Sequence, residues 1–354
     1  MWWGIREFDL LAHNITVPGL SPLFPEVHCT QDGSVCQVVT GEGQINAAVT
    51  LSALTASPLF DLSRTYFLMA GIAGVNPEVT TINSVNFARY AVQVALQYEI
   101  DLRELPENFS TSYFPQGAEA PFEYPTSIYG TEVFEVNAEL QAIAAKFARR
   151  ATLEDSKVSQ EYRALYSKAE DGMYAAATNP PSVLECDVAT TDVYYNGKLL
   201  GEAFGKTVSV LTNGTGVYCT TAQEDNATLE VLMRAAQTQR VDFARIIIMR
   251  TGSNFERQHS GQSALDNLIY AEQGAFEPSV KNLYHAGVQV VQGILQGWNN
   301  TFAHGVKPSN YIGDIFGTLG GQPDFGPGRK ASLEGAGALT KRGRVGLGGL
   351  EARR

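Results

Sequence analysis

The chain of 354 residues has the composition of a globular protein, with 44% hydrophobic and 18% charged residues. This length is sufficient for one large α/β domain or for two smaller ones. The formal net charge of −11 excludes a protein that binds nucleic acid mainly through a basic surface. No sequence window reaches the roughly 18 consecutive apolar residues that a membrane helix needs, so we expect no membrane span.

The predicted elements begin with a strand, a turn and a second strand over residues 28–39. A glycine-flanked turn at residues 41–46 then leads into a helix over residues 45–59. The continuous apolar run at 66–75 predicts a strand buried on both faces. This run ends in Ala70-Gly71 and Ala73-Gly74, where the absence of side-chain bulk lets backbone N–H groups approach a ligand closely.

The later elements continue to alternate between strand and helix. We expect strands over 85–94, 183–187, 206–211 and 243–249, and helices over 132–150, 220–239 and 275–297. The irregular segment 101–128 is typical of a binding loop. The alternation predicts a single α/β/α sandwich of three layers around a mixed sheet, over residues 1–326. Residues 327–354 are basic and rich in glycine, which predicts a disordered tail.

Cysteine and histidine spacing argues against a metal site. Cys29, Cys36, Cys186 and Cys219 form no CxxC pair, and the five histidines show no HxxxH spacing, so we expect neither a metal nor another cofactor. Cys29 and Cys36 flank a predicted hairpin turn and can face each other across two strands. Together with five Asn-x-Ser/Thr sequons they point towards a secreted protein. Buried thiols and chance sequons are the alternative.

Six sequence blocks occur in an order that resembles the purine nucleoside permease family of fungi and bacteria. They are NITVPGLSP at 14–22, GEGQINAA at 41–48, AGIAGVNP at 70–77, TTDVYYN at 190–196, CTTAQEDN at 219–226 and RTGSNF at 250–255. The resemblance covers nearly all of the chain from Trp2 to about Gly328. That family is in turn distantly similar to the superfamily of nucleoside phosphorylases and hydrolases, which implies their fold and a purine nucleoside as ligand.

The resemblance also implies which residues form the site. Glu224 or Asp225 would place a carboxylate beneath the ribose hydroxyls, where it stabilises the positive charge that develops on the sugar. Asn254 would donate a hydrogen bond to the departing purine, although an amide cannot serve as a general acid. The other candidates for substrate binding are Gly43, Asn46, Gly71, Ile72, Ala73, Gly74, Tyr194, Ser253 and Phe255. Without the resemblance, the carboxylates are ordinary first-turn helix residues and Asn254 is a strand-end residue.

Ile72 separates the two reaction classes that the resemblance implies. Phosphorylases similar to this fold carry a Ser or Thr at the matching position to bind phosphate, whereas the hydrolases carry an aliphatic residue. Ile72 therefore favours hydrolysis, with phosphate as a second candidate ligand. The alternative is a nucleoside-binding component of nucleoside transport without catalysis, or a degenerate relative without activity. Arg250 and Arg257, which flank Ser253 and Asn254, are further candidates for binding an anion.

The resemblance does not determine the oligomeric state or the cellular location of the protein. The chain begins after the position of the superfamily's first strand, so we expect a sheet that lacks that strand. Residues 1–7 contain neither the basic nor the apolar region of a signal peptide. The protein would be secreted or associated with the cell surface if a signal peptide precedes this sequence, and cytoplasmic otherwise. A homo-oligomer is compatible with the resemblance.

Overall fold

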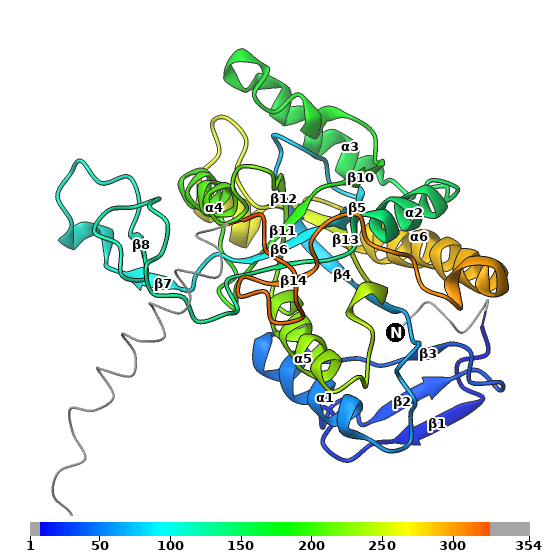
Figure 1. The fold of residues 1–354 in the computed structure, drawn as a ribbon. Helices are drawn as coiled ribbons and strands as arrows, with labels where there is room; N and C mark the ends of the chain where they lie inside the picture. Colours follow the sequence, from blue (N-terminus) through cyan, green and yellow to red (C-terminus); the bar gives the residue numbers. More distant parts are fainter. Residues whose placement is uncertain (1–7, 326–354) are drawn as a thin grey trace, which may run out of the picture.

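The computed structural model describes residues 8–325, so the predicted tail at 327–354 lies outside the described part (Figure 1). A mixed sheet of nine strands forms the centre of the molecule, in the order β10-β5-β13-β4-β12-β11-β6-β9-β14. These strands are β4 (Phe67–Val75), β5 (Val85–Ala88), β6 (Tyr90–Gln93), β9 (Val133–Glu135), β10 (Val183–Glu185), β11 (Asp187–Thr190), β12 (Tyr218–Ala222), β13 (Ile246–Phe255) and β14 (Gly313–Asp314).

Helices cover both faces of this sheet, which confirms the predicted sandwich of three layers (Figure 1). Alternate residues of β13 show the two faces. Ile246 and Ile248 pack towards α1 (Gln44–Ala56) and α5 (Asp225–Gln237), whereas Ile247 and Met249 pack towards the opposite layer. That opposite layer contains α2 (Ala138–Ala148), α4 (Lys198–Leu211) and α6 (Phe276–Gln296).

Smaller elements lie around the sandwich. An antiparallel sheet is formed by β1 (His13–Thr16), β2 (Glu26–Cys29) and β3 (Cys36–Gln37). A hairpin of β7 (Gln97–Glu99) and β8 (Tyr113–Pro115) projects from one side, and β8 lies within the segment 101–128 that was predicted to be irregular (Figure 1). The remaining helical segments are η1 (Leu102–Glu104), α3 (Lys157–Ala164), η2 (Leu165–Lys168), η3 (Glu170–Gly172), η4 (Ala176–Thr178), η5 (Phe243–Arg245), η6 (Asp266–Tyr270) and η7 (Trp298–Phe302). None of the helices between residues 8 and 325 has the length and hydropathy of a membrane-spanning segment.

The strand predicted over 85–94 is interrupted, and its two halves occupy distant positions in the sheet. β5 pairs with β10 and β13, whereas β6 pairs with β11 and β9. At the interruption, the buried Asp187 carboxylate accepts hydrogen bonds from the backbone N–H groups of Arg89 (3.0 Å) and Tyr90 (2.8 Å). A carboxylate at this point satisfies backbone donors that a continuous ladder would otherwise use.

Two predicted boundaries and one predicted element type are wrong. The helix expected over 132–150 begins with strand β9, and Asn137 caps the helix proper by accepting hydrogen bonds from the N–H groups of Glu139 and Leu140. The strand expected over 206–211 is the end of helix α4, whose apolar face packs on the sheet. The helix expected over 220–239 begins only at Asp225, because residues 218–222 form strand β12.

Strand β4 was predicted correctly, but its burial differs from the prediction. Residues from Phe67 to Ile72 remain partly exposed, although all are apolar or glycine. One edge pairs with β13 along the whole strand, whereas β12 meets the other edge only at Val75. Ile72, expected in a glycine loop, lies within the strand and pairs with Thr251.

Two disulfides link the four cysteines. Cys29–Cys36 joins β2 to β3, as the hairpin spacing allowed, and Cys186–Cys219 joins the residue between β10 and β11 to β12. The second bond was not foreseen, because its cysteines are 33 residues apart and become neighbours only through the parallel pairing of β11 and β12.

Candidate functional site

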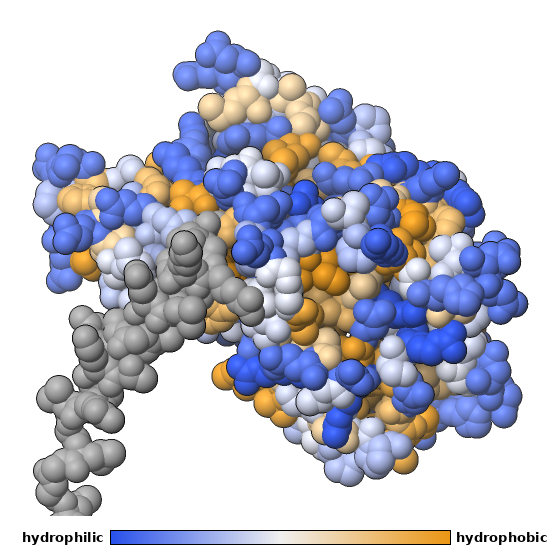
Figure 2. All heavy atoms as spheres, viewed as in Figure 1, coloured by the Kyte–Doolittle hydropathy of each residue, from blue (hydrophilic) through white to orange (hydrophobic). Residues whose placement is uncertain are grey.

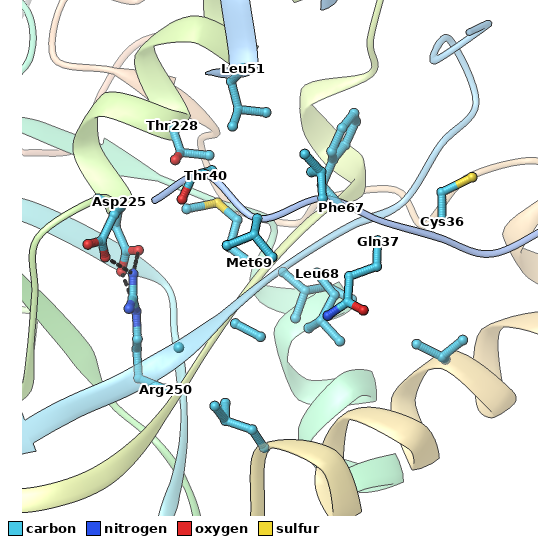
Figure 3. Close-up of a pocket in the computed structure, with 18 of the residues that line it drawn as sticks. Cys36, Gln37, Thr40, Leu51, Phe67, Leu68, Met69, Asp225, Thr228 and Arg250 are labelled. Carbon is cyan, nitrogen blue, oxygen red and sulfur yellow. Dashed lines mark hydrogen bonds and ion pairs between the residues drawn. The ribbon is translucent and has the colours of Figure 1, made fainter. Parts of the chain in front are cut away.

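A cleft of about 2160 Å³ opens along β4 and passes between the layers of helices. Its walls include residues of α1, β4, α5, β13 and α6, so the cleft runs through the sandwich and does not lie on one face (Figure 3). Seven of the predicted binding residues line it: Asn46, Gly71, Ile72, Ala73, Gly74, Tyr194 and Ser253. Glu224 and Asp225 line it as well.

The centre of the site is a buried arginine between two carboxylates. Arg250 on β13 is only 6% exposed, and its Nε donates to Asp225 Oδ2 at 3.2 Å. Its Nη2 donates to Asp225 Oδ1 and, at 3.2 Å, to Glu224 Oε2. Figure 3 shows Arg250 and Asp225 pointing towards each other from β13 and the start of α5. Arg250 was predicted as a candidate for binding an anion, but in the folded chain two carboxylates are already paired with it.

Burial and pairing act in opposite directions on this cluster. Burial raises the pKa of the Asp225 carboxyl above its ordinary value, while the charge of Arg250 and its hydrogen bonds oppose that rise. Burial alone would lower the pKa of Arg250, but the charges of Asp225 and Glu224 raise it above its ordinary value. Both effects are expected when a charged pair leaves water and each partner stabilises the other's charge.

Gly71 provides the space for this arginine. It lies opposite Arg250 in the parallel β4–β13 pair, and a Cβ at position 71 would overlap Arg250 Nη1. The glycine therefore has a steric function in this strand. The predicted approach of Gly71 to a ligand stays a prediction; the atom that a Cβ at this position would meet first belongs to the guanidinium of Arg250.

Glu224 connects the arginine to the start of helix α1. Its Oε1 accepts a hydrogen bond from the N–H of Gly43 at 3.0 Å, and Gly43 precedes α1 with a φ of 87°. Asp192 Oδ1 accepts the next N–H, from Gln44, at 2.7 Å. Two carboxylates from other parts of the chain thus satisfy two of the free donors at the N-terminus of α1, which has no side-chain cap of its own. Asp192 was not among the predicted site residues.

Asn254 and Tyr194 form a second polar group close to the cleft. The register of β13 against β4 shifts between Gly252 and Asn254, as in a β-bulge. Asn254 Oδ1 accepts hydrogen bonds from the hydroxyls of Tyr194 and Ser253, both at 3.0 Å. Its Nδ2 donates to the carbonyl of Phe255 at 3.2 Å, which leaves the second hydrogen of this amide without a protein partner in the described residues.

Two predicted binding residues lie away from the cleft. Phe255 is fully buried, with its ring centroid 4.1 Å from that of Tyr166. Gly43 contributes its N–H to Glu224 but does not line the cleft. Arg257, the second anion candidate, is buried between Glu256 and Glu78, with nitrogen–oxygen distances of 2.5 and 2.6 Å.

The site has no features of a metal centre. Within residues 8–325, no three His, Cys, Asp or Glu side chains converge as metal ligands would. The polar groups that the described residues bring to the site are two carboxyl groups, a guanidinium, an amide and hydroxyls.

The family model and the relatives that match this chain carry the same description. Residues 1–307 match the family model described as purine nucleoside permease. A purine nucleoside permease of Candida albicans is 45% identical over 331 residues, which are 92% of this chain and 79% of the relative. A probable purine nucleoside permease of Schizosaccharomyces pombe is 41% identical over 305 residues, which are 84% of this chain and 86% of the relative.

The solved structures that are similar to this chain include a 5′-methylthioadenosine/S-adenosylhomocysteine nucleosidase from Colwellia psychrerythraea in complex with adenine. The similarity covers 80% of this chain and 88% of that protein, with 13% sequence identity and a TM-score of 0.45.

Proposed function

Because this chain belongs to the purine nucleoside permease family, we propose that its cleft binds a purine nucleoside and hydrolyses the N-glycosidic bond. The observation that carries this proposal is the position of Glu224. Gly43 and Arg250 hold this carboxylate at the cleft, yet 18% of the side chain remains exposed. An oriented carboxylate with free lone pairs can accept hydrogen bonds from the 2′ and 3′ hydroxyls of a ribose.

Glu224 and Asp225 have different functions in this proposal. Asp225 is fully buried and is paired with Arg250 through both of its oxygens, so it is a positioning residue. Glu224 is the residue that contacts the sugar. As the bond from C1′ to N9 breaks, positive charge develops on the ribose, and the negative charge of Glu224 stabilises it.

Asn254 is assigned to the purine. Its free amide hydrogen can donate to N7 as negative charge gathers on the leaving base, and Tyr194 and Ser253 fix the orientation of the amide. The bond from C1′ to N9 breaks, the oxygen of a water molecule bonds to C1′, and protons redistribute through solvent to give ribose and a neutral purine. An amide supplies no proton, so Asn254 assists the departure only by hydrogen bonding.

Water is favoured over phosphate by the charge of the cluster. The guanidinium of Arg250 is already paired with the carboxyl groups of Glu224 and Asp225, so the cluster offers no free positive charge to an incoming phosphate dianion. Ile72 adds no hydroxyl that would compensate. Both observations support hydrolysis.

The test is turnover by the purified protein. Adenosine, inosine and guanosine would be incubated with and without inorganic phosphate, and the products separated by chromatography. We expect free base and ribose at a rate independent of phosphate. A rate that rises with phosphate and yields ribose 1-phosphate would contradict hydrolysis.

A second function is nucleoside binding for transport, without catalysis. It is favoured by the amide of Asn254, because an amide cannot protonate the leaving purine. In that case nucleosides would raise the melting temperature of the protein without being cleaved. The same incubations, followed by thermal unfolding, separate the two functions.

A further inference from the structure

The asparagines of the five Asn-x-Ser/Thr sequons have different surroundings in the folded chain. Asn14 lies on β1, Asn213 follows α4, Asn226 lies in α5 and Asn299 lies in η7. Asn108 lies in the irregular segment between η1 and β8. Asparagines that carry N-linked glycans lie on surface loops of secreted proteins, so the surroundings of each amide show which sequon is suited to modification.

The sequon at Asn226 is closed to modification in the folded protein. Its side chain is only 1% exposed, and its Nδ2 donates hydrogen bonds to the carbonyl oxygens of Ala91 at 3.3 Å and Thr131 at 2.8 Å. An N-linked glycan is attached through this nitrogen, so its addition would remove a donor from these carbonyls and place a sugar in the core. Asn226 is therefore an internal negative reference.

Asn108 has the opposite surroundings. It lies in a turn at residues 106–109, in which the N–H of Phe109 donates to the carbonyl of Pro106 at 3.0 Å. Its side chain is exposed, and no residue between 8 and 325 forms a hydrogen bond with its amide. Ser110, the hydroxyl residue of the same sequon, is exposed as well. Both side chains that define this sequon are thus accessible.

The other three sequons have side chains or backbones that are more restrained. Asn14 Oδ1 accepts a hydrogen bond from His28 Nδ1 at 2.6 Å. Asn213 Nδ2 donates to the carbonyl of Asp324 at 3.5 Å. Asn299 lies within the helical turn η7. Asn108 is therefore the sequon that combines a surface loop with a free amide.

The cysteines provide an independent observation. All four form disulfides, Cys29–Cys36 and Cys186–Cys219. Disulfides persist in secreted and cell-surface proteins and are rare in compartments that keep thiols reduced. The alternative of buried thiols, which the sequence left open, does not describe this fold. An oxidising compartment is also where sequons of secreted proteins are modified.

The projecting hairpin exposes apolar side chains near Asn108. Tyr98 and Ile100 are exposed, and Figure 2 shows hydrophobic atoms among hydrophilic ones on this projection. The ring of Phe109 lies 5.5 Å from that of Phe114, which pairs with Tyr98 across β7 and β8. A glycan at Asn108 would begin beside this apolar surface, where a bulky polar group keeps the hairpin soluble.

We propose that Asn108 carries an N-linked glycan and that Asn226 does not. The donor is an oligosaccharide linked to a lipid diphosphate. Nδ2 of Asn108 forms a bond to C1 of the first sugar, and the bond from C1 to the diphosphate oxygen breaks, so that the lipid diphosphate leaves with the electron pair. Nδ2 gives one proton to a base of the transferring enzyme and keeps the other. This modification does not depend on the proposed nucleoside chemistry.

The test uses the full chain purified from the cells that naturally produce it. Peptide N-glycosidase in water labelled with heavy oxygen converts a glycosylated asparagine to a labelled aspartate, which mass spectrometry of the peptides detects. We expect the label at Asn108 and none at Asn226, and a sample without the enzyme controls for spontaneous deamidation. The proposal is overturned if the peptide that contains Asn108 carries no label or if Asn226 is labelled.

A pair of variants tests the sequon itself. Ser110→Ala removes the hydroxyl that the sequon requires and leaves Asn108 in place. Ser209→Ala removes an exposed hydroxyl of α4 that belongs to no sequon. In the same cells, the first variant should lose the label at Asn108 and migrate faster on a denaturing gel, whereas the second should behave as the wild type. Retention of the label in Ser110→Ala would also overturn the proposal, because the modification would then not follow the sequon.

Discussion

Gly71 of β4 and Arg250 of β13 lie opposite each other in adjacent parallel strands, so that the guanidinium occupies the space where another residue would carry its Cβ. This relationship determines the geometry of the site. Arg250 reaches Asp225 and Glu224 only because position 71 has no side chain, and Glu224 in turn holds the start of α1 through Gly43.

Gly71→Ala should therefore displace Arg250 from its two carboxylates. We expect a loss of about 1–3 kcal/mol in the free energy of unfolding, which is typical of overpacking at a rigid position. Urea denaturation measures it. Gly205→Ala in α4 is the matched control, because its Cβ would meet only the ring edge of Tyr218 at 3.3 Å. Equal effects of the two substitutions would contradict the steric function of Gly71.

Removal of Arg250 itself should lower the free energy of unfolding more than Gly71→Ala does. Arg250→Met leaves Asp225 fully buried without its cation, which typically costs about 3–5 kcal/mol. Adding Asp225→Asn removes the unpaired charge, so the double variant should be more stable than the single one. Arg234→Met serves as the control, because that arginine is exposed and forms an i, i+4 pair with Glu230 worth less than about 1 kcal/mol. If Arg250→Met lowered the free energy of unfolding no more than Arg234→Met does, the cluster of Arg250, Asp225 and Glu224 would not stabilise the fold.

Glu224→Gln tests the carboxylate that the proposed function assigns to the ribose. Hydrogen bonds to a charged acceptor are worth about 1.5–3 kcal/mol, so nucleoside affinity should fall about 10- to 150-fold. Isothermal titration calorimetry measures this change. Glu42→Gln alters an exposed glutamate at the same cleft and should leave the affinity unchanged. Unchanged affinity in Glu224→Gln would remove the ribose assignment.

The sequence predicted the layers of this fold and offered Glu224, Asp225 and Arg250 as site residues, but it did not predict that these three residues contact one another. Long apolar or periodic segments such as β4 and α6 were recognisable, because their pattern extends over many residues. The short strand β9 lies directly before α2 and was absorbed into the predicted helix, since three residues show no alternation. Thr207, Val208 and Val210 favour a strand by propensity, yet packing of α4 on the sheet prevails.

Arg250 shows what a sequence can reveal about a buried charge. It follows four apolar residues of one strand, and an arginine in such a strand requires a buried partner. The adjacent acidic residues Glu224 and Asp225 were the available signal. Their distance of about 25 residues from Arg250 gave no indication of contact, because the pairing depends on strand order in the sheet.

The two disulfides should differ in their contribution to stability. In the loop-entropy description, a bond that closes 33 residues contributes about 3.7 kcal/mol and one that closes 7 residues about 2.3 kcal/mol. Replacing Cys186 and Cys219 by alanine should therefore destabilise the protein more than replacing Cys29 and Cys36, as measured by thermal unfolding. The reverse order would show that loop length does not govern these bonds.

Acidification should stabilise the protein through Glu256. This residue is buried, and burial raises the pKa of its carboxyl from 4.5 to about 7, although Arg257 opposes the rise. Because the folded pKa lies above the unfolded one, the folded state binds the proton more tightly. The resulting stability is fully present below pH 4.5 and is lost as the pH rises through about 7.

We therefore expect the free energy of unfolding to rise between pH 8 and pH 6, with about 1 kcal/mol of the rise coming from Glu256. Glu256→Gln keeps the shape of the side chain without its titration, so the same acidification should stabilise this variant less. Buried Glu135 and Asp187, with pKa values raised by burial to about 7 and about 6, retain their part of the pH dependence in both proteins. Denaturation curves at the two pH values for the wild type, Glu256→Gln and the exposed control Glu42→Gln isolate the effect. Parallel changes in all three proteins would assign the pH dependence to other groups.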